Sequence, residues 1–241
     1  MVFGSLRRLA VVGLGAALAS APALYGSAQT PLAEQSHAYG AYSEPIYGAD
    51  FTSFASANAD APKDCTLNLS ARGSFDTLNP WIVNGRFAGG VFELLYDGLL
   101  ISSPDEVSVG YGLIAESVDV SDSGDRATFS LHADAQFHDG HPILAEDVVF
   151  TAGIFRETAR PFWRLLLKDA EVTATGEREV TVQFPEDVDR TAVLSFGLMP
   201  VLPEHYWASR DFGSITMEPP LGSGPYRIDD VDAGRSISFA R

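Results

Sequence analysis

Alternating apolar and polar residues predict the strands of this chain. Five segments show the alternation, which places apolar side chains on one face of a strand: 66–72, 116–120, 126–132, 171–175 and 179–184. The last two flank Gly176-Glu177, so they are expected to form a β-hairpin. A glycine-rich turn at 222–225 opens a further strand, which returns through 236–239.

Helical spacing predicts a helix that begins near Ala145, after a turn that contains Asp139-Gly140. Val148, Ala152 and Phe155 recur every three or four residues and give this helix one face to bury. Two carboxylates lie in its first turn, where the free N–H groups and the positive end of the helix dipole stabilise them. Shorter helices are predicted over 91–99, over 191–198 and after Pro203.

Strands and helices together predict a mixed α/β fold. The chain has 241 residues with 46% hydrophobic content, which is enough to bury a core in one large or two modest domains. Its formal net charge of −16 argues against a nucleic-acid partner, because phosphates need lysine and arginine. Cys65 is the only cysteine, so no intrachain disulfide can form.

The first 28 residues have the pattern of a secretory signal peptide. Arg7-Arg8 precedes the apolar run 9–19, and Gly26-Ser27-Ala28 offers a small-x-small cleavage site. An earlier cut would place Pro22 immediately after the scissile bond, which peptidases tolerate badly. The apolar run is shorter than the roughly 20 residues of a membrane span. Cleavage after Ala28 is expected to release the protein into the periplasm with a net charge of −18.

Residues 29–64 show neither a helical nor a strand period, and we expect an extended or poorly ordered leader. The segment is rich in alanine, serine, tyrosine and glycine. Tyr39, Tyr42 and Tyr47 are expected to pack onto the surface of the following domain or to stay mobile. The alternative is that these three tyrosines form an aromatic recognition strip.

The long loop 73–90 is the main candidate for ligand binding. Connections in compact domains usually have about 4–6 residues, and longer ones are often functional. Ligands of open α/β sheets bind beyond the C-terminal ends of strands. We therefore expect one wall of a ligand site to contain five residues of this loop: Asn79, Trp81, Asn84, Gly85 and Phe87. The alternative, that Trp81 and Phe87 only anchor the loop to the core, stays open.

The turn before the central helix is a candidate for metal chemistry. Four residues can supply ligands: His138, Asp139, His141 and Glu146. However, a glycine and a proline interrupt the turn, so its histidines lack the i, i+4 helical spacing of zinc hydrolases. A plain turn and helix start is favoured, with no catalytic residue, metal ligand or cofactor. An exported metal-dependent hydrolase that uses His138 and His141 is the alternative of another class.

Five motifs in a fixed order resemble a known family. The most specific is Phe137-His138-Asp139-Gly140-x-Pro142-x-x-Ala145-Glu146-Asp147-Val148-x-Phe150. The others are Leu95-Tyr96-Asp97-Gly98-Leu99-Leu100, Leu113-Ile114-Ala115-Glu116-Ser117-Val118, Thr128-Phe129-Ser130-Leu131 and Gly222-Ser223-Gly224-Pro225-Tyr226-Arg227. On these residues the chain resembles the family 5 extracellular solute-binding proteins of ABC transporters, carriers of oligopeptides, dipeptides and nickel, from about residue 65 to residue 241.

Three further segments look like the Yej-type branch of that family, which is associated with peptide and microcin C uptake: Leu202-Pro203-Glu204-His205-Tyr206-Trp207, Glu218-Pro219-Pro220-Leu221 and Ala233-Gly234-Arg235-Ser236-Ile237. The resemblance implies a non-enzymatic, monomeric carrier that captures oligopeptides in the periplasm. It delivers them to the permease subunits of an ABC importer in the inner membrane. A sugar, an opine or a metal chelate is the alternative cargo.

The resemblance also implies a domain division. Members of the family are expected to be two-lobed clamps of roughly twice the size of this chain, which close over the ligand by a hinge motion. This chain is expected to be lobe I of a type II periplasmic-binding-protein fold, with the second lobe missing. Its core subdomain is expected to comprise 65–100 and 196–241, with an α+β subdomain inserted at 101–195. With half of the site absent, such a chain is expected to bind ligand weakly or not at all.

One departure from the family concerns the start of the central helix. The family usually has threonine where this chain has Leu144, and that hydroxyl would cap the helix in a Thr-x-x-Asp box with Asp147. Leucine cannot accept a hydrogen bond through its side chain. The first N–H groups therefore need another acceptor, such as Asp139 or water, or the helix start is weaker by about 1 kcal/mol.

Overall fold

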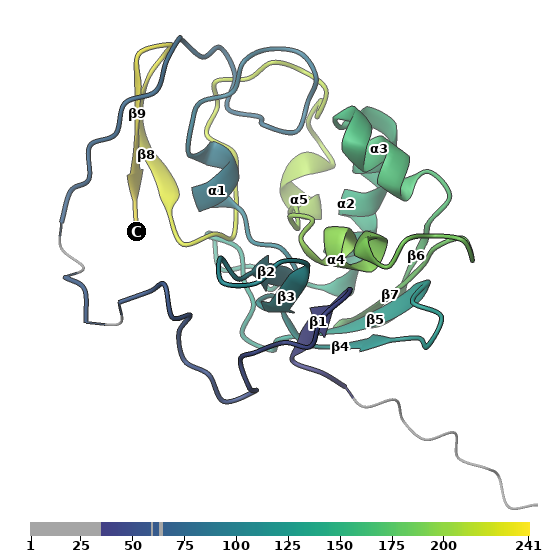
Figure 1. Ribbon diagram of the computed structural model, residues 1–241. Coiled ribbons are helices and arrows are strands. Elements are labelled where there is room, and N and C mark those ends of the chain that lie inside the picture. The colour runs from purple at the N-terminus through teal and green to yellow at the C-terminus, as the bar shows by residue number, and fades with distance from the viewer. Residues whose placement is uncertain (1–34, 59, 63–64) are drawn as a thin grey trace, which may run out of the picture. The chain divides into compact units, whose positions relative to one another are not determined.

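The computed structural model describes residues 35–58, 60–62 and 65–241, drawn in colour in Figure 1. The predicted signal peptide, residues 1–28, and the first part of the predicted leader lie outside the described residues. Among the described residues, no helix combines the length and the apolar character that crossing a membrane requires. The thiol of Cys65 is exposed and unpaired.

A four-stranded antiparallel sheet forms the largest layer of the fold. Its strands are β4 (Ala115–Val120), β5 (Arg126–Leu131), β6 (Glu171–Gly176) and β7 (Glu179–Gln183), paired in the order β4-β5-β7-β6. The four strands match the predicted ones, and the hairpin of β6 and β7 turns where Gly176-Glu177 predicts. The alternation of apolar and polar residues thus located this sheet correctly.

The two faces of the sheet have different environments. Phe129 of β5 lies opposite Val180 of β7 on the buried face, where its ring lies 5.8 Å from that of Phe196. On the other face, Thr128 and Thr181 are paired across the same two strands, with their hydroxyl oxygens 2.9 Å apart. The sheet therefore buries one face against helices and leaves a half-exposed polar face outside.

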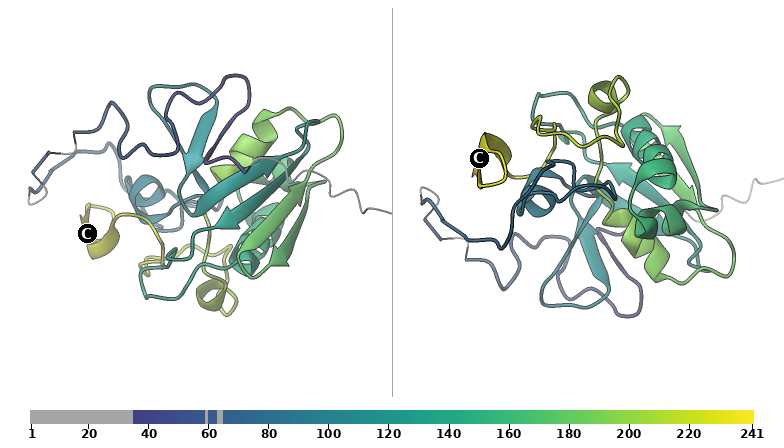
Figure 2. Two further views of the ribbon diagram at one scale, coloured as in Figure 1. Left: turned by 90° about the horizontal axis from the view of Figure 1, so that it is seen from below. Right: turned by 90° about the horizontal axis from the view of Figure 1, so that it is seen from above.

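Helices cover the buried face. They are α2 (Ala145–Thr158), α3 (Pro161–Leu167), α4 (Thr191–Gly197) and α5 (Glu204–Trp207). In Figure 2, α2 lies along β6 and β7, and α3 packs on α2. Helix α3 is not predicted from the sequence, because it buries only Trp163 and Leu167, four residues apart. Two buried positions are too few to establish a helical period.

The start of α2 is stabilised without a side-chain cap from Leu144. The N–H of Ala145 donates to the carbonyl oxygen of Glu177 at 3.0 Å. The N–H of Leu144 donates to a carboxylate oxygen of Asp147 at 2.9 Å, which is one half of a capping box. The expectation that Asp139 supplies an acceptor is wrong, because the hairpin that carries Glu177 supplies it instead.

A second antiparallel sheet joins three short strands. These are β1 (Ala38–Gly40), β2 (Leu100–Ser102) and β3 (Val109–Gly112), in the order β1-β3-β2. Strand β1 belongs to the segment for which we expected a poorly ordered leader, so the structure differs from that expectation over its described part. The physical reason is that β1 pairs its backbone with β3, a long-range partner that local periodicity cannot reveal.

An aromatic cluster attaches the rest of this segment to the second sheet. Tyr111 of β3 is buried beneath three rings whose centroids lie 5.2–5.6 Å from its own: Tyr47, Phe51 and Phe54. Tyr42 donates to a carboxylate oxygen of Asp189 at 2.7 Å. The prediction that these tyrosines pack onto the following domain is confirmed for Tyr39 and Tyr47, which pack against the two core clusters.

A short helix and a hairpin complete the described fold. The helix, α1 (Val91–Leu95), ends earlier than predicted, and Leu99 is buried beyond its end. The hairpin pairs β8 (Arg227–Asp232) with β9 (Ser236–Ala240) and packs on α1 (Figure 1).

The alternating segment 66–72 does not form the predicted strand. The side chains of Leu67 and Leu69 are 79% and 85% exposed. No described strand is hydrogen-bonded to this segment, so its backbone has no ladder to join. The alternation is nevertheless that of a half-buried strand.

Candidate functional site

The loop 73–90 divides its five predicted site residues into two groups. Asn79 and Trp81 are buried. The side-chain amide of Asn79 donates to the Phe212 carbonyl oxygen at 2.9 Å, and its oxygen accepts the Trp81 N–H at 3.0 Å. Trp81 is 1% exposed and packs against three rings at centroid distances of 4.9–5.4 Å: Phe92, Tyr96 and Phe155. The structure therefore places these two residues in the core.

The other three residues lie at the surface. Asn84 and Gly85 are exposed and Phe87 is half-buried. Gly85 has a φ of +82°, which only glycine adopts readily. The guanidinium of Arg160 lies 5.2 Å from the centroid of the Phe87 ring and donates to the Pro80 carbonyl oxygen at 2.9 Å. Asn84, Gly85 and Phe87 are thus accessible to a ligand, whereas Asn79 and Trp81 position the loop.

The turn 137–142 holds His138 in a structural role. The Nε2 atom of His138 lies 2.8 Å from the carbonyl oxygen of Gly224. The backbone N–H of His138 donates to the carbonyl oxygen of Gly222 at 2.9 Å. The imidazole therefore faces the glycine-rich turn and not His141. Glu146 is exposed on α2 and belongs to no described group of possible metal ligands. The arrangement that the hydrolase alternative needs, with His138 beside His141, is absent from the described residues.

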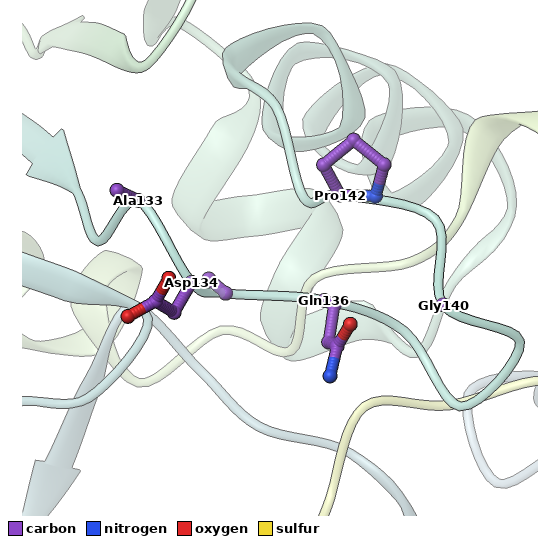
Figure 3. Close-up of a pocket in the computed structure, with 6 residues that line it drawn as sticks. Ala133, Asp134, Gln136, Gly140 and Pro142 are labelled. Carbon is purple, nitrogen blue, oxygen red and sulfur yellow. The ribbon is translucent and has the colours of Figure 1, made fainter.

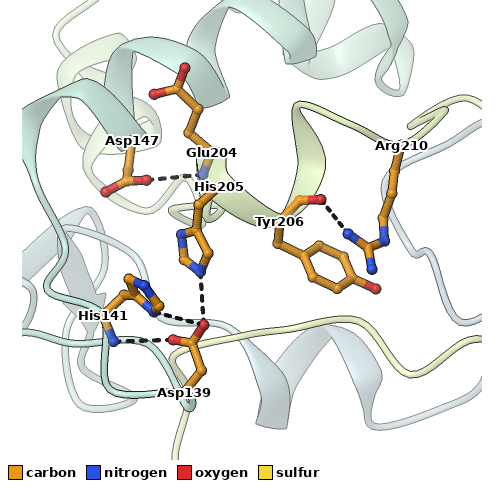
Figure 4. A network of polar contacts seen from close by, with 7 residues as sticks. All are labelled: Asp139, His141, Asp147, Glu204, His205, Tyr206 and Arg210. Atoms are coloured by element: carbon orange, nitrogen blue, oxygen red, sulfur yellow. Dashed lines mark hydrogen bonds and ion pairs between the residues drawn. The ribbon is translucent and has the colours of Figure 1, made fainter.

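The structure brings Asp139 and His141 together with His205 of α5, a residue that belongs to a family motif but to none of the predicted sites (Figure 4). One carboxylate oxygen, Oδ2 of Asp139, lies 2.8 Å from His205 Nε2 and 3.0 Å from His141 Nδ1. The two imidazole rings stack at a centroid distance of 4.2 Å. His205 lies 66 residues from Asp139, so only the folded chain reveals this triad.

Hydrogen bonds set the ionisation of Asp139. Partial burial raises the pKa of its carboxyl group, but the hydrogen bond with His205 and that from the His141 N–H outweigh this effect and leave the pKa below its ordinary value. The lowered pKa favours the ionised form of the Asp139 carboxyl group.

Asp147 connects α2 to α5 and so positions His205. Its Oδ1 accepts the Glu204 N–H at 3.0 Å (Figure 4). Its Oδ2 accepts the Leu144 N–H. Burial raises the pKa of Asp147, and the two backbone hydrogen bonds oppose that shift. A carboxylate with both oxygens engaged in this way orients the first turn of α5.

Two neighbouring hollows lie beside the turn. Figure 3 shows the first, of about 250 Å³, bordered by Ala133, Asp134, Ala135, Gln136, Gly140 and Pro142. The second, of about 280 Å³, lies next to it and includes Asp97, His132 and Asp134. Ligand pockets usually measure about 300–1,000 Å³. Neither hollow alone is therefore large enough to enclose an oligopeptide.

Comparison with known proteins agrees with the fold. The chain is 37% identical over 198 residues to a protein of Agrobacterium fabrum named "Probable peptide-binding protein YejA", covering 79% of this chain and 32% of that protein. It is 34% identical to the "Peptidoglycan-binding protein YepA" of the same organism, covering 94% of this chain and 39% of that protein. The chain thus spans about a third of the length of these relatives.

Solved structures share the fold. The oligopeptide-binding protein AppA of Bacillus subtilis, in complex with a nonapeptide, matches with a TM-score of 0.60 and 19% identity, covering 70% of this chain and 34% of that one. Residues 111–241, more than half of the chain, match the family model described as "Bacterial extracellular solute-binding proteins, family 5 Middle". The chain therefore belongs to the family 5 extracellular solute-binding proteins.

Proposed function

We propose that this protein is the substrate-binding component of an ABC importer, which captures oligopeptides in the periplasm and delivers them to permease subunits in the inner membrane. The observation that carries the proposal is the family match over residues 111–241. The names of the relatives support the cargo, since one is called a probable peptide-binding protein and AppA was solved with a nonapeptide. The role is non-enzymatic, and the carrier acts as a monomer without a nucleic-acid partner.

Export to the periplasm is part of the same proposal. The arginine pair, the apolar run and the small residues before position 29 support cleavage of a signal peptide after Ala28. The family description, extracellular solute-binding proteins, supports the same location.

The domain division at 65–100 with 196–241, and at 101–195, is also a proposal. Contacts between the two outer segments support it. The hydroxyl of Ser74 donates to the Gly234 carbonyl oxygen at 2.9 Å, and the β8–β9 hairpin packs on α1. The four-stranded sheet β4-β5-β7-β6, by contrast, lies entirely within 101–195.

We assign one wall of the peptide site to the exposed part of the loop: Asn84, Gly85 and Phe87. An amide, a free backbone at glycine and an aromatic face suit a ligand that is recognised through its peptide groups and apolar side chains. Two thirds of the length of the relatives lies outside the match, and we assign the opposite wall to that part. Asn79 and Trp81 support this wall from the core.

Calorimetry with the intact protein tests the proposal. A set of peptides from dipeptides to nonapeptides should include at least one that binds with a micromolar or lower Kd. The upper length is that of the peptide bound to AppA. Asn84→Ala and Phe87→Ala should each raise the Kd of that peptide by about tenfold (about 1.4 kcal/mol). Val107→Ala, which removes an exposed apolar side chain between β2 and β3, is the matched control and should leave binding unchanged. Absence of peptide binding to the intact protein would refute the proposal.

A peptidoglycan fragment is the second candidate cargo. The similarity to a protein named for peptidoglycan binding, over 94% of this chain, favours it. Titrating peptides obtained from digested peptidoglycan in the same calorimeter separates the two. Tighter binding of these fragments than of any ordinary peptide would identify the second cargo.

A further inference from the structure

We infer that Asp139, His141 and His205 form a binding site for a divalent first-row transition-metal ion, for which Zn²⁺ is the probe. The three residues come from the turn before α2 and from the start of α5, and each offers one ligand atom. This site is separate from the exposed loop that we assign to the peptide, and the inference does not depend on the cargo.

The distances fit a metal. A tetrahedral zinc ion with bonds of 2.0–2.1 Å holds its ligand atoms about 3.3 Å apart. Oδ2 of Asp139 already lies 2.8 Å from one imidazole nitrogen and 3.0 Å from the other, and all three ligand atoms lie within 4.8 Å of one another. His141 and His205 are both exposed, so rotation of their side chains is the adjustment that admits the ion.

The donor set also selects the class of metal. Two neutral imidazoles and one carboxylate suit Zn²⁺, Cu²⁺ or Ni²⁺, whereas Ca²⁺ and Mg²⁺ prefer oxygen ligands alone. Three protein ligands leave room for water in the remaining positions. The chain as a whole carries a net charge of −16, which raises the local concentration of cations at its surface.

Surrounding contacts hold the ligands in place. Oδ1 of Asp139 accepts the His141 N–H at 3.1 Å, which leaves Oδ2 to face the two rings. The carbonyl oxygen of His141 accepts the Phe137 N–H at 2.9 Å, and the Phe137 ring lies edge-on to His205 at 5.8 Å. The bond from Asp147 to the first turn of α5 is drawn in Figure 4. Together, these contacts hold both sides of the site. Such supporting contacts raise metal affinity.

The alternative is a purely polar contact, in which the two imidazoles share the Asp139 carboxylate through protons. The metal site and the polar contact bring the same three side chains together. Only the metal site requires that the protein takes up one metal ion per chain.

Zinc titration of the intact protein, prepared without a polyhistidine tag, tests the inference. Native mass spectrometry and calorimetry should show one Zn²⁺ per chain, removable with EDTA. At 100-fold excess over Kd, Zn²⁺ should raise the Tm by about 2–4 °C for a protein as long as the relatives. Less than stoichiometric uptake, or no rise in Tm, would overturn the inference.

Variants locate the ion. His141→Ala and His205→Ala should each weaken Zn²⁺ binding at least about tenfold. Loss of a residue that only supports a metal ligand already lowers metal affinity by about 10–100-fold. Asp139→Asn should weaken it while keeping an acceptor for the His141 N–H. His132→Ala is the matched control: it is an exposed histidine 4.0 Å from the Asp134 carboxylate, without a second imidazole. Unchanged affinity in the His141→Ala, His205→Ala double variant, or an equal loss in His132→Ala, would place the ion elsewhere and overturn the assignment.

Discussion

A Cβ atom added to Gly222 would lie 2.0 Å from the carbonyl oxygen of Leu95. The backbone of the glycine-rich turn approaches the end of α1 this closely because the N–H groups of Ser223 and Gly224 both donate to that oxygen, at 3.0 and 2.9 Å. Asp97 donates its own N–H to the Ser223 hydroxyl at 3.1 Å. The turn therefore fastens two segments that are distant in sequence, and only glycine leaves room for the contact.

Replacing this glycine should destabilise the protein. Gly222→Ala forces the two backbones apart and weakens the hydrogen bonds on the Leu95 oxygen, so we expect a loss of about 2–4 kcal/mol in the free energy of unfolding. Urea denaturation followed by circular dichroism measures it. The matched control is Gly153→Ala in α2, where a Cβ would meet no atom within 4 Å. That change should stabilise by up to about 1 kcal/mol.

A buried hydroxyl links α2 to the segment before α5. Thr151 donates to the Asp147 carbonyl oxygen at 2.6 Å and accepts the Leu202 N–H at 2.9 Å. Thr151→Val keeps the shape but leaves that N–H unpaired in the core, which should cost about 1–3 kcal/mol in urea denaturation. Thr151→Ser keeps the hydroxyl and should cost less. Unchanged stability in Thr151→Val, with a loss only in Thr151→Ser, would show that the methyl group, and not the hydrogen bond, matters.

Asp97 should make the stability depend on pH. Burial raises the pKa of its carboxyl group from an ordinary value of 3.8 to about 6. The folded state then retains a proton that the unfolded state releases, so the contribution of Asp97 to the free energy of unfolding falls as pH rises from about 4 to about 6 and is level above that. Because the carboxyl group is partly exposed, solvent screening limits the loss to roughly 1–2 kcal/mol.

Substituting Asp97 tests this pH dependence. Asp97→Asn should reduce the loss between pH 4 and pH 6 and raise stability at pH 7. Some loss of stability with rising pH should remain in this variant, because burial also raises the pKa of Asp147. Two other titratable residues border the same hollow, His132 and Asp134. Asp134→Asn serves as the control and should leave the pH dependence in place; a flat profile in that variant would exclude Asp97 as the cause.

Trp81 should matter for stability more than Phe87 does. Trp81→Ala removes the largest fully buried side chain and leaves a cavity among Phe92, Tyr96 and Phe155, which should cost about 3–5 kcal/mol. Phe87 is half-buried, so Phe87→Ala should cost less than about 2 kcal/mol. Thermal and urea denaturation measure both. If Trp81→Ala left stability unchanged, the side chain would belong to the ligand site and not to the core.

Much of the fold is predictable from the sequence because its elements have local causes. The alternation at 126–132 and the helical spacing of Val148, Ala152 and Phe155 predict β5 and α2, which the structure confirms. Strand β1 and helix α3 escaped prediction. The first depends on a distant pairing partner and the second is too short for a period.

The candidate sites also divide into features that the sequence determines and features that the tertiary structure determines. The long loop, the turn with its two histidines and the ordered motifs of a solute-binding family are properties of the sequence alone, since residue types at fixed spacing define them. Which side chains of the loop reach solvent, which histidine faces Gly224 and which one meets His205 are decided by tertiary structure. Residues 66 positions apart become neighbours only after the core has packed, because local pattern carries no information on such a contact.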